Sequence, residues 1–516
     1  MASRNASDDA AETGLEHALL FNFVIHGVAL VGMALLLLPT LPGGANTDDA
    51  ARIATIAEHP WRFRCGWLPW QLCAVADLWL AVAMVRARFL PRAVAIAVLV
   101  ATAIAVVPDQ YAQFAWVTRG VELAQADPAA YLAFEARIFP LTAGWGALFY
   151  TVAALGWTWC FARSGAWSRA LTWLSVPLWS CMVVAVVGPL LPLALRPSPS
   201  FVSTANGCGF LMLQVWLGLL TERVLLRRRP YASFGRLAPW RHPGSGPLAR
   251  GLDVVSNSRL ARALLGVLPA VKMRSAITDV VYVNYLVDAE RLASLVPVGL
   301  ELQRVGPAGE YALFTFLTYQ HHDFGFAFLG KLRRLFPSPV QSNWRIHVLD
   351  PRTGHRGIYF VTNAVSHVLP ALGARLLTEG MPMHLLEQAE LTRAEDGQLR
   401  VVLTPGQGSA PDAQLALRAA SGVPDWSGVW AAAWPNFRAF LGYCVPQDRA
   451  LSTQPLRRRT ARQEIDLGIA LDACQPLEGR VTSQAARALI GDASPLCFRV
   501  PALAFAFDGE LYDAWD

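Results

Sequence analysis

Three polar side chains recur at every second position of one short segment, residues 342–349, which reads Ser-Asn-Trp-Arg-Ile-His-Val-Leu. Successive side chains of a strand point to opposite faces, so Asn343, Arg345 and His347 share one face. A guanidinium can hold a carboxylate through two parallel hydrogen bonds. Imidazole titrates near neutrality, which suits a general base. If this face lines a pocket, the three side chains could hold the carboxylate of a small organic acid. The alternative is the solvent-facing side of an antiparallel strand.

A second group of chemically active side chains lies downstream, in and just before Gly380-Met-Pro-Met-His-Leu385. It comprises Arg375, Glu379, Met383 and His384, which join the three strand residues as candidate ligand-binding residues. Arg375 and Glu379 are four positions apart. If residues 371–379 are helical, these two side chains form an ordinary pair worth about 0.2–0.5 kcal/mol.

This second group resembles the active-site segment of the acetoacetate decarboxylase family, roughly Gly-Arg-Glu, a short spacer and Gly-aromatic-Pro-Lys-Lys-Leu. Residues 380–385 match its second half, except that Met383 and His384 occupy the two lysine positions. In that family a lysine forms a Schiff base because a neighbouring cation depresses its pKa. Thioether and imidazole cannot form this imine. The family's arginine also lies one residue nearer the glycine than Arg375 does.

The resemblance extends over the whole C-terminal half. Residues 281–302 are similar to the opening of such domains, where a strand leads to a helix that ends at a Leu-x-Pro-x-Gly-Leu turn. The resemblance implies an α+β domain over residues 272–516, with a curved, cone-like antiparallel sheet around a pocket. Residue composition predicts helices over 289–296 and 429–441, and it predicts strands over 278–287, 310–320, 342–349, 357–363, 398–403, 414–419 and 496–507.

The N-terminal half has the composition of a membrane domain. Hydrophobic residues make up 54% of the chain and charged residues 16%, and the long apolar runs all precede Arg227. We expect an all-α, six-helix transmembrane domain over residues 1–226, which resembles no family we recognise. An Arg/Pro/Gly-rich juxtamembrane linker over 227–271 follows. Each expected span is close to the roughly 20 residues that cross a bilayer, and the spans are 15–38, 66–85, 90–107, 138–161, 171–195 and 201–225.

Arginine placement predicts the orientation of these spans. Loops 86–92 and 163–169 and the segment after the last span are rich in arginine, whereas acidic residues offset the basic ones in loops 39–65 and 108–137. Positively charged loops face the cytoplasm. We therefore expect a multi-pass protein of the inner (plasma) membrane of a bacterium, with both termini in the cytoplasm.

Three polar residues of the expected spans need an explanation. Asn22 and His26 are four apart and share one face of the first span, and Asp77 lies midway along the second. A charge at mid-membrane is a functional hypothesis by default. One interpretation is that His26 pairs with Asp77 across a helix–helix contact and stabilises the packing of the two spans. A proton or ion pathway, or a quinone-like site, is the other.

Several classes of site are not expected. The C-terminal histidines lack H-x-x-x-H or H-x-H spacing, so no metal site is predicted. The eight cysteines form no C-x-x-C pair, which argues against a zinc ribbon or a disulfide framework. No basic stripe interleaved with aromatic residues is present, so no nucleic-acid partner is expected. The sequence predicts no cofactor.

Two functions from different classes fit these observations. In the first, the C-terminal domain binds a small organic acid or apolar ligand without Schiff-base chemistry, and the membrane half anchors it or responds to it. In the second, it is an enzyme on a small carboxylate or carbonyl substrate, with His384 or His347 as general base beside Arg345. A transporter with a regulatory domain is a third alternative, although no internal repeat is visible. The expected partners are the lipid bilayer and a small-molecule ligand, and self-assembly into an oligomer stays open.

Overall fold

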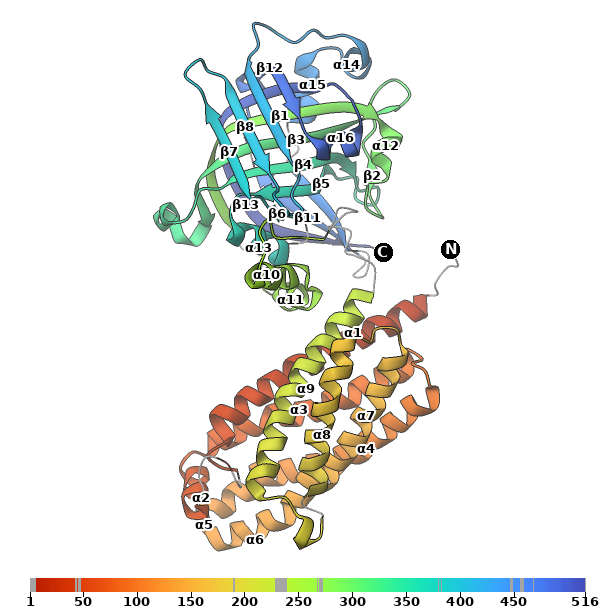
Figure 1. The fold of residues 1–516 in the computed structure, drawn as a ribbon, viewed down its shortest axis with the longest axis vertical. Coiled ribbons are helices and arrows are strands. Elements are labelled where there is room, and N and C mark those ends of the chain that lie inside the picture. The colour runs from red at the N-terminus through yellow and green to blue at the C-terminus, as the bar shows by residue number, and fades with distance from the viewer. Residues whose placement is uncertain are drawn as a thin grey trace. The chain divides into compact units, whose positions relative to one another are not determined.

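The computed structural model describes most of the chain and divides it into two compact units, residues 1–228 and 229–516 (Figure 1). The segment expected as a linker contains α10 (Pro247–Asn257) and α11 (Arg259–Leu265), which belong to the second unit. The described residues are 6–41, 44, 48–188, 191–227, 239–266, 268, 272–378, 380–381, 383–445, 449–454, 459–466 and 468–515.

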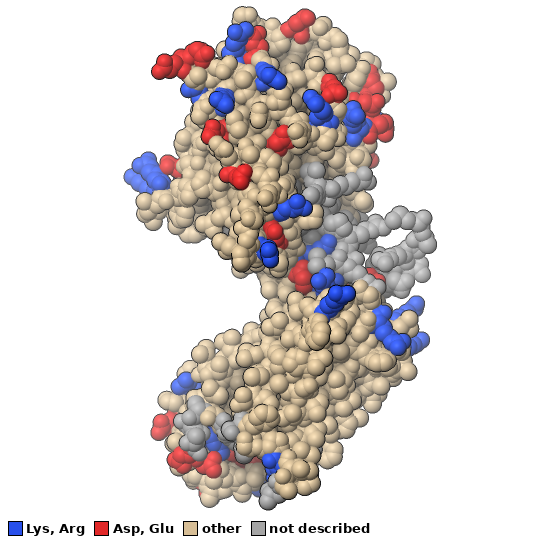
Figure 2. All heavy atoms as spheres, in the orientation of Figure 1, with Lys and Arg blue, Asp and Glu red and all other residues tan. Residues whose placement is uncertain are grey.

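The N-terminal unit is a helical bundle. Six of its helices are long and apolar enough to cross a membrane, as the composition predicts. On the face that Figure 2 shows, charged side chains gather at the two ends of the bundle and are sparse along its flank. The helices and π-helical turns are α1 (Ala6–Gly32), η1 (Met33–Leu37), α2 (Asp49–Glu58), α3 (Pro60–Arg86), α4 (Arg92–Ala115), η2 (Trp116–Gly120), α5 (Val121–Ala126), α6 (Pro128–Phe139), η3 (Pro140–Gly146), α7 (Ala147–Arg163), α8 (Arg169–Val187) and α9 (Pro199–Arg227).

The loop expected over residues 108–137 is almost entirely helical, which corrects that prediction. The third candidate span is continuous over Arg92–Ala126 and contains Pro108. The chain breaks at Asp127, whose side chain accepts hydrogen bonds from the backbone N–H groups of Ala129 and Ala130. Such a cap, followed by proline at the first helical position, starts a new helix. Neighbouring helices in a bundle tolerate the internal proline.

A buried ion pair joins α2 to α6 in this unit. Arg52 donates from Nη1 to Glu135 Oε1 at 2.8 Å and from Nη2 to Glu135 Oε2 at 2.7 Å. Tyr131 donates its hydroxyl to Glu135 Oε1 at 3.1 Å, and Asp49 accepts from Arg52 at 2.8 Å. Arg52 and Glu135 are both buried. The Arg52–Glu135 pair was not predicted from the sequence, because both residues lie in segments that were expected to be external loops.

The C-terminal unit is built on one 13-stranded sheet. Strands β1-β3-β4-β5-β10-β11-β13 pair in that order, and β13 pairs back onto β1, so the sheet closes on itself (Figure 1). Strands β12-β9-β8-β7 continue from β13 as an arm. The strands are β1 (Met273–Asp288), β2 (Glu301–Leu302), β3 (Tyr311–Phe326), β4 (Val340–Leu349), β5 (Arg356–Val365), β6 (Met383–Leu385), β7 (Gln388–Arg393), β8 (Leu399–Thr404), β9 (Ala413–Ala419), β10 (Arg449–Gln454), β11 (Arg459–Asp466), β12 (Gln475–Thr482) and β13 (Leu496–Ala514).

This sheet is mixed, whereas a purely antiparallel sheet was predicted. Strand β5 pairs in parallel with β10, at Ala450 and Ile358, and with β6, at Asn363 and Met383. A parallel neighbour requires a crossover connection. Helix α13 (Val368–Leu377) supplies the crossover between β5 and β6. The short β6 was not predicted as a strand, so neither was its direction.

The closed part of the sheet buries both of its faces. Alternate residues of β1, β3, β4 and β5 pack outward under the arm and under α12 (Ala289–Ala293) and α16 (Gln484–Ile490). The other residues of β1 and β3 pack inward against α14 (Gly428–Ala433) and α15 (Phe437–Cys444). The single helix expected over 429–441 is thus two helices. The break falls at Pro435, and the side chain of Asn436 caps α15 at the Ala439 N–H.

Candidate functional site

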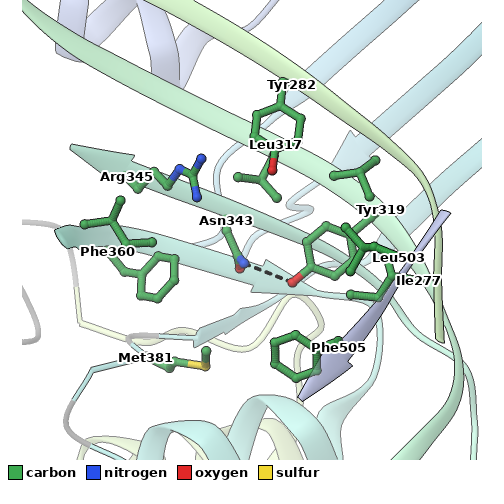
Figure 3. Close-up of a pocket in the computed structure, with 12 residues that line it drawn as sticks. Ile277, Tyr282, Leu317, Tyr319, Asn343, Arg345, Phe360, Met381, Leu503 and Phe505 are labelled. Atoms are coloured by element: carbon green, nitrogen blue, oxygen red, sulfur yellow. Dashed lines mark hydrogen bonds between the residues drawn. The ribbon is translucent and has the colours of Figure 1, made fainter. Parts of the chain in front are cut away.

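A small cavity lies inside the closed sheet, and the charged and amide groups that reach it come from β4 (Figure 3). Most of its wall is apolar or aromatic, with two tyrosines among the lining side chains. Such a wall with a few polar groups is the usual composition of a small-molecule site. The lining residues are Ile277, Val280, Tyr282, Leu317, Tyr319, Asn343, Arg345, Ile358, Phe360, Met381, Leu503 and Phe505.

Strand alternation puts the polar residues of β4 on the inner face. Asn343 and Arg345 line the cavity, while Trp344 and Ile346 join the outer core. On β1 the regular alternation is interrupted, because Ile277 and Val280 both face the cavity. The register with β3 shifts between Thr278 and Val281, and a β-bulge of this kind turns an extra residue out of the ladder.

Arg345 is the only cationic side chain among the described residues that line the cavity, and it is 3% exposed. Its Nη2 donates to the backbone carbonyl of Cys444 at 3.3 Å, and its guanidinium lies 5.5 Å from the ring centroid of Tyr282. Within the described part of the chain, Nε has no hydrogen-bond partner and no carboxylate forms an ion pair with Arg345. An uncompensated buried charge is costly. The cavity therefore favours an anion.

A chain of hydrogen bonds orients the amide beside this charge. Gln341 donates to Asn343 Oδ1 at 2.8 Å, and Asn343 donates to the Tyr319 hydroxyl at 2.9 Å (Figure 3). Behind them, His321 Nε2 lies 3.0 Å from Gln341 Oε1 and Nδ1 lies 2.8 Å from Ser275 Oγ. Because Tyr319 accepts from Asn343, its own O–H is available to a ligand in the cavity.

The tyrosine and histidine side chains here are neutral near pH 7. Burial lowers the pKa of His321 to about 4. Burial raises the pKa of Tyr282 to about 12, although Arg345 acts in the opposite direction. The phenols of Tyr282 and Tyr319 are thus hydrogen-bond donors, and among the described lining residues only the Arg345 guanidinium is charged. Neither tyrosine was a sequence candidate. Extending the alternation of Asn343 and Arg345 to the neighbouring strands β3 and β1 would have pointed to them.

His347 is buried on the same face of β4 as Asn343 and Arg345, but it is not among the residues that line this cavity. Its ring lies 4.9 Å from the ring of Tyr443, centroid to centroid. Burial lowers its pKa to about 3, with Arg345 adding to the effect. The closed sheet covers this end of β4 with α15, so the imidazole packs against an aromatic side chain of that helix.

Met381, Met383 and His384 have different surroundings. Met381 lines the cavity, whereas Met383 packs with Trp240, Val365 and Leu385 against α13. His384 Nδ1 lies 2.6 Å from Ser409 Oγ, and burial lowers its pKa to about 3. The reason is the pairing of β6 with β5, which directs Met383 to the helix side.

Arg375 is also separated from the cavity. It lies in α13 and donates from Nε to the carbonyl of Ser256 at 3.0 Å and from Nη2 to Asn257 Oδ1 at 3.2 Å. It therefore holds α13 to the end of α10. Glu379, its predicted partner, lies outside the described residues.

Neither lysine of the chain faces the cavity. Lys272 precedes β1, with its side chain 64% exposed and Nζ 3.9 Å from Asp508 Oδ1. Lys331 is exposed in the connection between β3 and β4. An exposed ammonium keeps an ordinary hydration shell, so neither site resembles the desolvated amine that Schiff-base chemistry requires.

Comparison with known proteins finds a family match in the C-terminal unit. Residues 274–419 match DUF2071. That family is described as an uncharacterized conserved protein, and the match runs from β1 to β9. No curated protein matches the chain.

Two solved structures match part of the chain. The enduracididine biosynthesis enzyme MppR complexed with pyruvate is 15% identical, with a TM-score of 0.33, and the match covers 48% of this chain and 91% of that chain. An acetoacetate decarboxylase-like enzyme from Sphingomonas wittichii RW1 is 12% identical, with a TM-score of 0.33. The match covers 48% of this chain and 95% of that chain.

The intramembrane candidates come together in the N-terminal unit. Asn22 donates from Nδ2 to Asp77 Oδ1 at 2.7 Å, and His26 Nε2 lies 3.9 Å from the same oxygen. His26 Nδ1 lies 2.9 Å from the carbonyl of Asn22. The hydrogen bond and the His26–Asp77 contact join α1 to α3.

Asp109 on α4 is a second buried carboxylate. The sequence pattern had placed it in the loop expected over residues 108–137. Gln113 Nε2 donates to Asp109 at 2.9 Å and the Tyr150 hydroxyl at 3.3 Å, and Thr142 Oγ1 also donates to it. Thr142 lies in the π-helical turn η3, which joins α6 to α7.

Proposed function

We propose that this protein is a multi-pass membrane protein whose C-terminal domain binds a small organic anion inside the closed sheet. The observation that carries this proposal is Arg345, a buried guanidinium that lines the cavity and meets no carboxylate among the described residues. A ligand carboxylate would accept from it and from the Asn343 amide or the Tyr319 hydroxyl. The apolar remainder of the ligand would contact Phe360, Phe505 and Leu503.

Binding is the activity that this geometry favours over catalysis. The histidines suggested as general bases, His347 and His384, do not line the cavity, and burial lowers the pKa of each to about 3. A base of that pKa is almost fully unprotonated at neutral pH but has little affinity for a proton. The groups that do line the cavity hold a carboxylate without an evident nucleophile.

Small carboxylates should therefore stabilise the full chain. In detergent or nanodiscs, we expect acetate, pyruvate, acetoacetate or butyrate to raise the temperature of unfolding. A ligand at about 100 times its Kd adds roughly 2.7 kcal/mol. Butyramide, which has the shape of butyrate without its charge, is the matched control and should have no effect. Equal stabilisation by butyrate and butyramide would contradict the anion site.

The same proposal excludes Schiff-base decarboxylation. Treating the protein with acetoacetate and borohydride should leave Lys272 and Lys331, its only lysines, unmodified, since both are exposed and away from the cavity. Mass spectrometry of the two tryptic peptides is the measurement. Acetoacetate-dependent reductive labelling of either peptide, absent when acetoacetate is omitted, would overturn the claim.

For orientation, we propose a plasma-membrane protein with both termini in the cytoplasm. Arg86 ends α3, Arg92 begins α4, Arg163 ends α7 and Arg169 begins α8. Such positive connections stay on the cytoplasmic side. A reporter fused after Asp516 should behave as cytoplasmic, and one inserted at Asp127, between α5 and α6, as external. The reverse pattern would refute this orientation.

A further inference from the structure

The connection between β3 and β4 exposes an unusual set of apolar side chains. It forms the short helical segment η7 (Ala327–Leu335). Phe328 is 78% exposed, Leu332 59% and Leu335 80%, and Phe336 just beyond is also exposed. None of the described residues of η7 is buried. Large side chains gathered in this way mark an interaction surface.

The same segment is strongly basic. Residues 326–336 include Lys331, Arg333 and Arg334 and no acidic residue. Asp323 Oδ2 lies 3.5 Å from Arg334 Nε, and the two side chains are exposed. Figure 2 shows basic side chains gathered where Figure 1 places this connection, at the left edge of the C-terminal unit. Exposed aromatic and leucine side chains among arginine and lysine are typical of segments that lie in a membrane interface.

Strand pairing places η7 at the end of the unit where the chain enters from the membrane half. Met273, at the start of β1, pairs with Phe326, at the end of β3. The Ala327 N–H donates to the Lys272 carbonyl at 2.8 Å. Lys272 follows the α10–α11 segment, which itself follows the last candidate span.

Helices α13 and α10 lie at this same end. Gln341, near the start of β4, pairs with Val365, at the end of β5, and α13 follows β5 directly. Arg375 of α13 holds the end of α10. Helix α10 exposes Leu248 at 78% and Val254 at 71%, together with Arg250. Two separate segments at one end of the unit thus present apolar and basic side chains to solvent.

We propose that this entry end of the C-terminal unit docks on an anionic lipid surface, with η7 seated at headgroup depth. Lysine and arginine would contact anionic headgroups, and Phe328, Leu332 and Leu335 would enter the acyl boundary. The charge is complementary to the cytoplasmic leaflet, where each basic residue near the surface contributes to binding. The six candidate spans keep the unit tethered to a bilayer, so docking needs little intrinsic affinity. The site is distinct from the Arg345 cavity.

The test uses the full chain in nanodiscs with an environment-sensitive fluorescent amino acid in place of Phe328. In discs containing phosphatidylglycerol and a spin-labelled lipid, we expect its emission to move to shorter wavelength and to be quenched by roughly half. The matched control is the same probe in place of Val423, an apolar residue that is 73% exposed and has no basic neighbour within three positions. It should be neither shifted nor quenched.

Charge removal separates lipid docking from other contacts. The triple variant Lys331→Gln, Arg333→Gln, Arg334→Gln should reduce quenching at position 328, as should phosphatidylcholine alone or high salt, because exposed charges are screened. Carboxylate binding in the cavity should be unchanged in this variant, so failure of one proposal is distinguishable from failure of the other. An unquenched probe at position 328 in anionic discs would overturn the proposal. A spectral shift that depends on two copies per disc would instead assign the surface to a second copy of this chain.

Discussion

Replacing Arg345 by Met is expected to abolish carboxylate binding while leaving the C-terminal unit folded. Truncating one partner of a buried, hydrogen-bonded charge pair costs about 2–5 kcal/mol, which is roughly 30-fold to more than 1000-fold in Kd. In the unliganded chain the guanidinium is buried without a carboxylate among the described residues. A methionine of similar volume removes that uncompensated charge, so the free energy of unfolding should stay the same or rise.

The measurement is the Kd for butyrate, by titration calorimetry on the full chain, together with thermal unfolding without ligand. Arg304→Met is the matched control, because Arg304 is largely exposed and pairs with Glu290 at 2.6 Å on the surface. It should leave Kd unchanged. If Arg345→Met lowers stability by several kcal/mol and binding persists in the folded fraction, Arg345 is structural and the anion site fails.

Replacing Glu135 by Gln is expected to destabilise the N-terminal unit by about 3–5 kcal/mol. The change removes the buried two-point partner of Arg52 and leaves it only the carboxylate of Asp49, whose side chain is 61% exposed, and loss of one partner of a buried pair is the costly case. The double variant Arg52→Met, Glu135→Leu removes both charges and should cost clearly less than either single change. Unfolding in detergent, followed by helix content, gives the coupling free energy from this cycle.

The exposed pair Arg119–Glu122 is the control for the buried Arg52–Glu135 pair. These side chains approach to 3.3 Å and are more than 60% exposed, so Glu122→Gln should change stability by less than about 1 kcal/mol. Equal effects of Glu135→Gln and Glu122→Gln would show that the α2–α6 pair contributes no more than a surface contact.

Local sequence patterns predicted the strand that carries Asn343 and Arg345. They did not predict the closure of the sheet that encloses the cavity. Alternation along residues 342–349 put Asn343 and Arg345 on one face, and both face the cavity. Alternation gives no information on which face of a strand lies inside. That is decided when β13 pairs with both β1 and β11 and closes the sheet. The same closure puts His347 beneath α15 and Tyr282 and Tyr319 beside Arg345.

The motif in residues 380–385 did not indicate side-chain orientation, because that orientation depends on a partner strand. Residues 380–385 matched a family segment position by position, yet Met381 faces the cavity in place of Met383 and His384. Three residues of β6 cannot set their own direction, because register is defined by the neighbouring strand. Pairing with β5 sends Met383 to the α13 side. In the membrane half, Asp109 and Glu135 were assigned to loops because a charge usually marks the end of a span.

The sequence by itself determined the division into an apolar helical half and a strand-rich half, since apolar run length and side-chain periodicity are local properties. It also determined the absence of lysine at positions 383 and 384. Only the tertiary structure decided that Arg345 is buried beside a cavity, that its neighbours are two tyrosines and an amide, and that the predicted histidines lie elsewhere. The physical reason is that burial and pairing depend on residues far apart in the chain. Asn343 meets Tyr319 across 24 positions, and Arg345 meets the Cys444 carbonyl across 99.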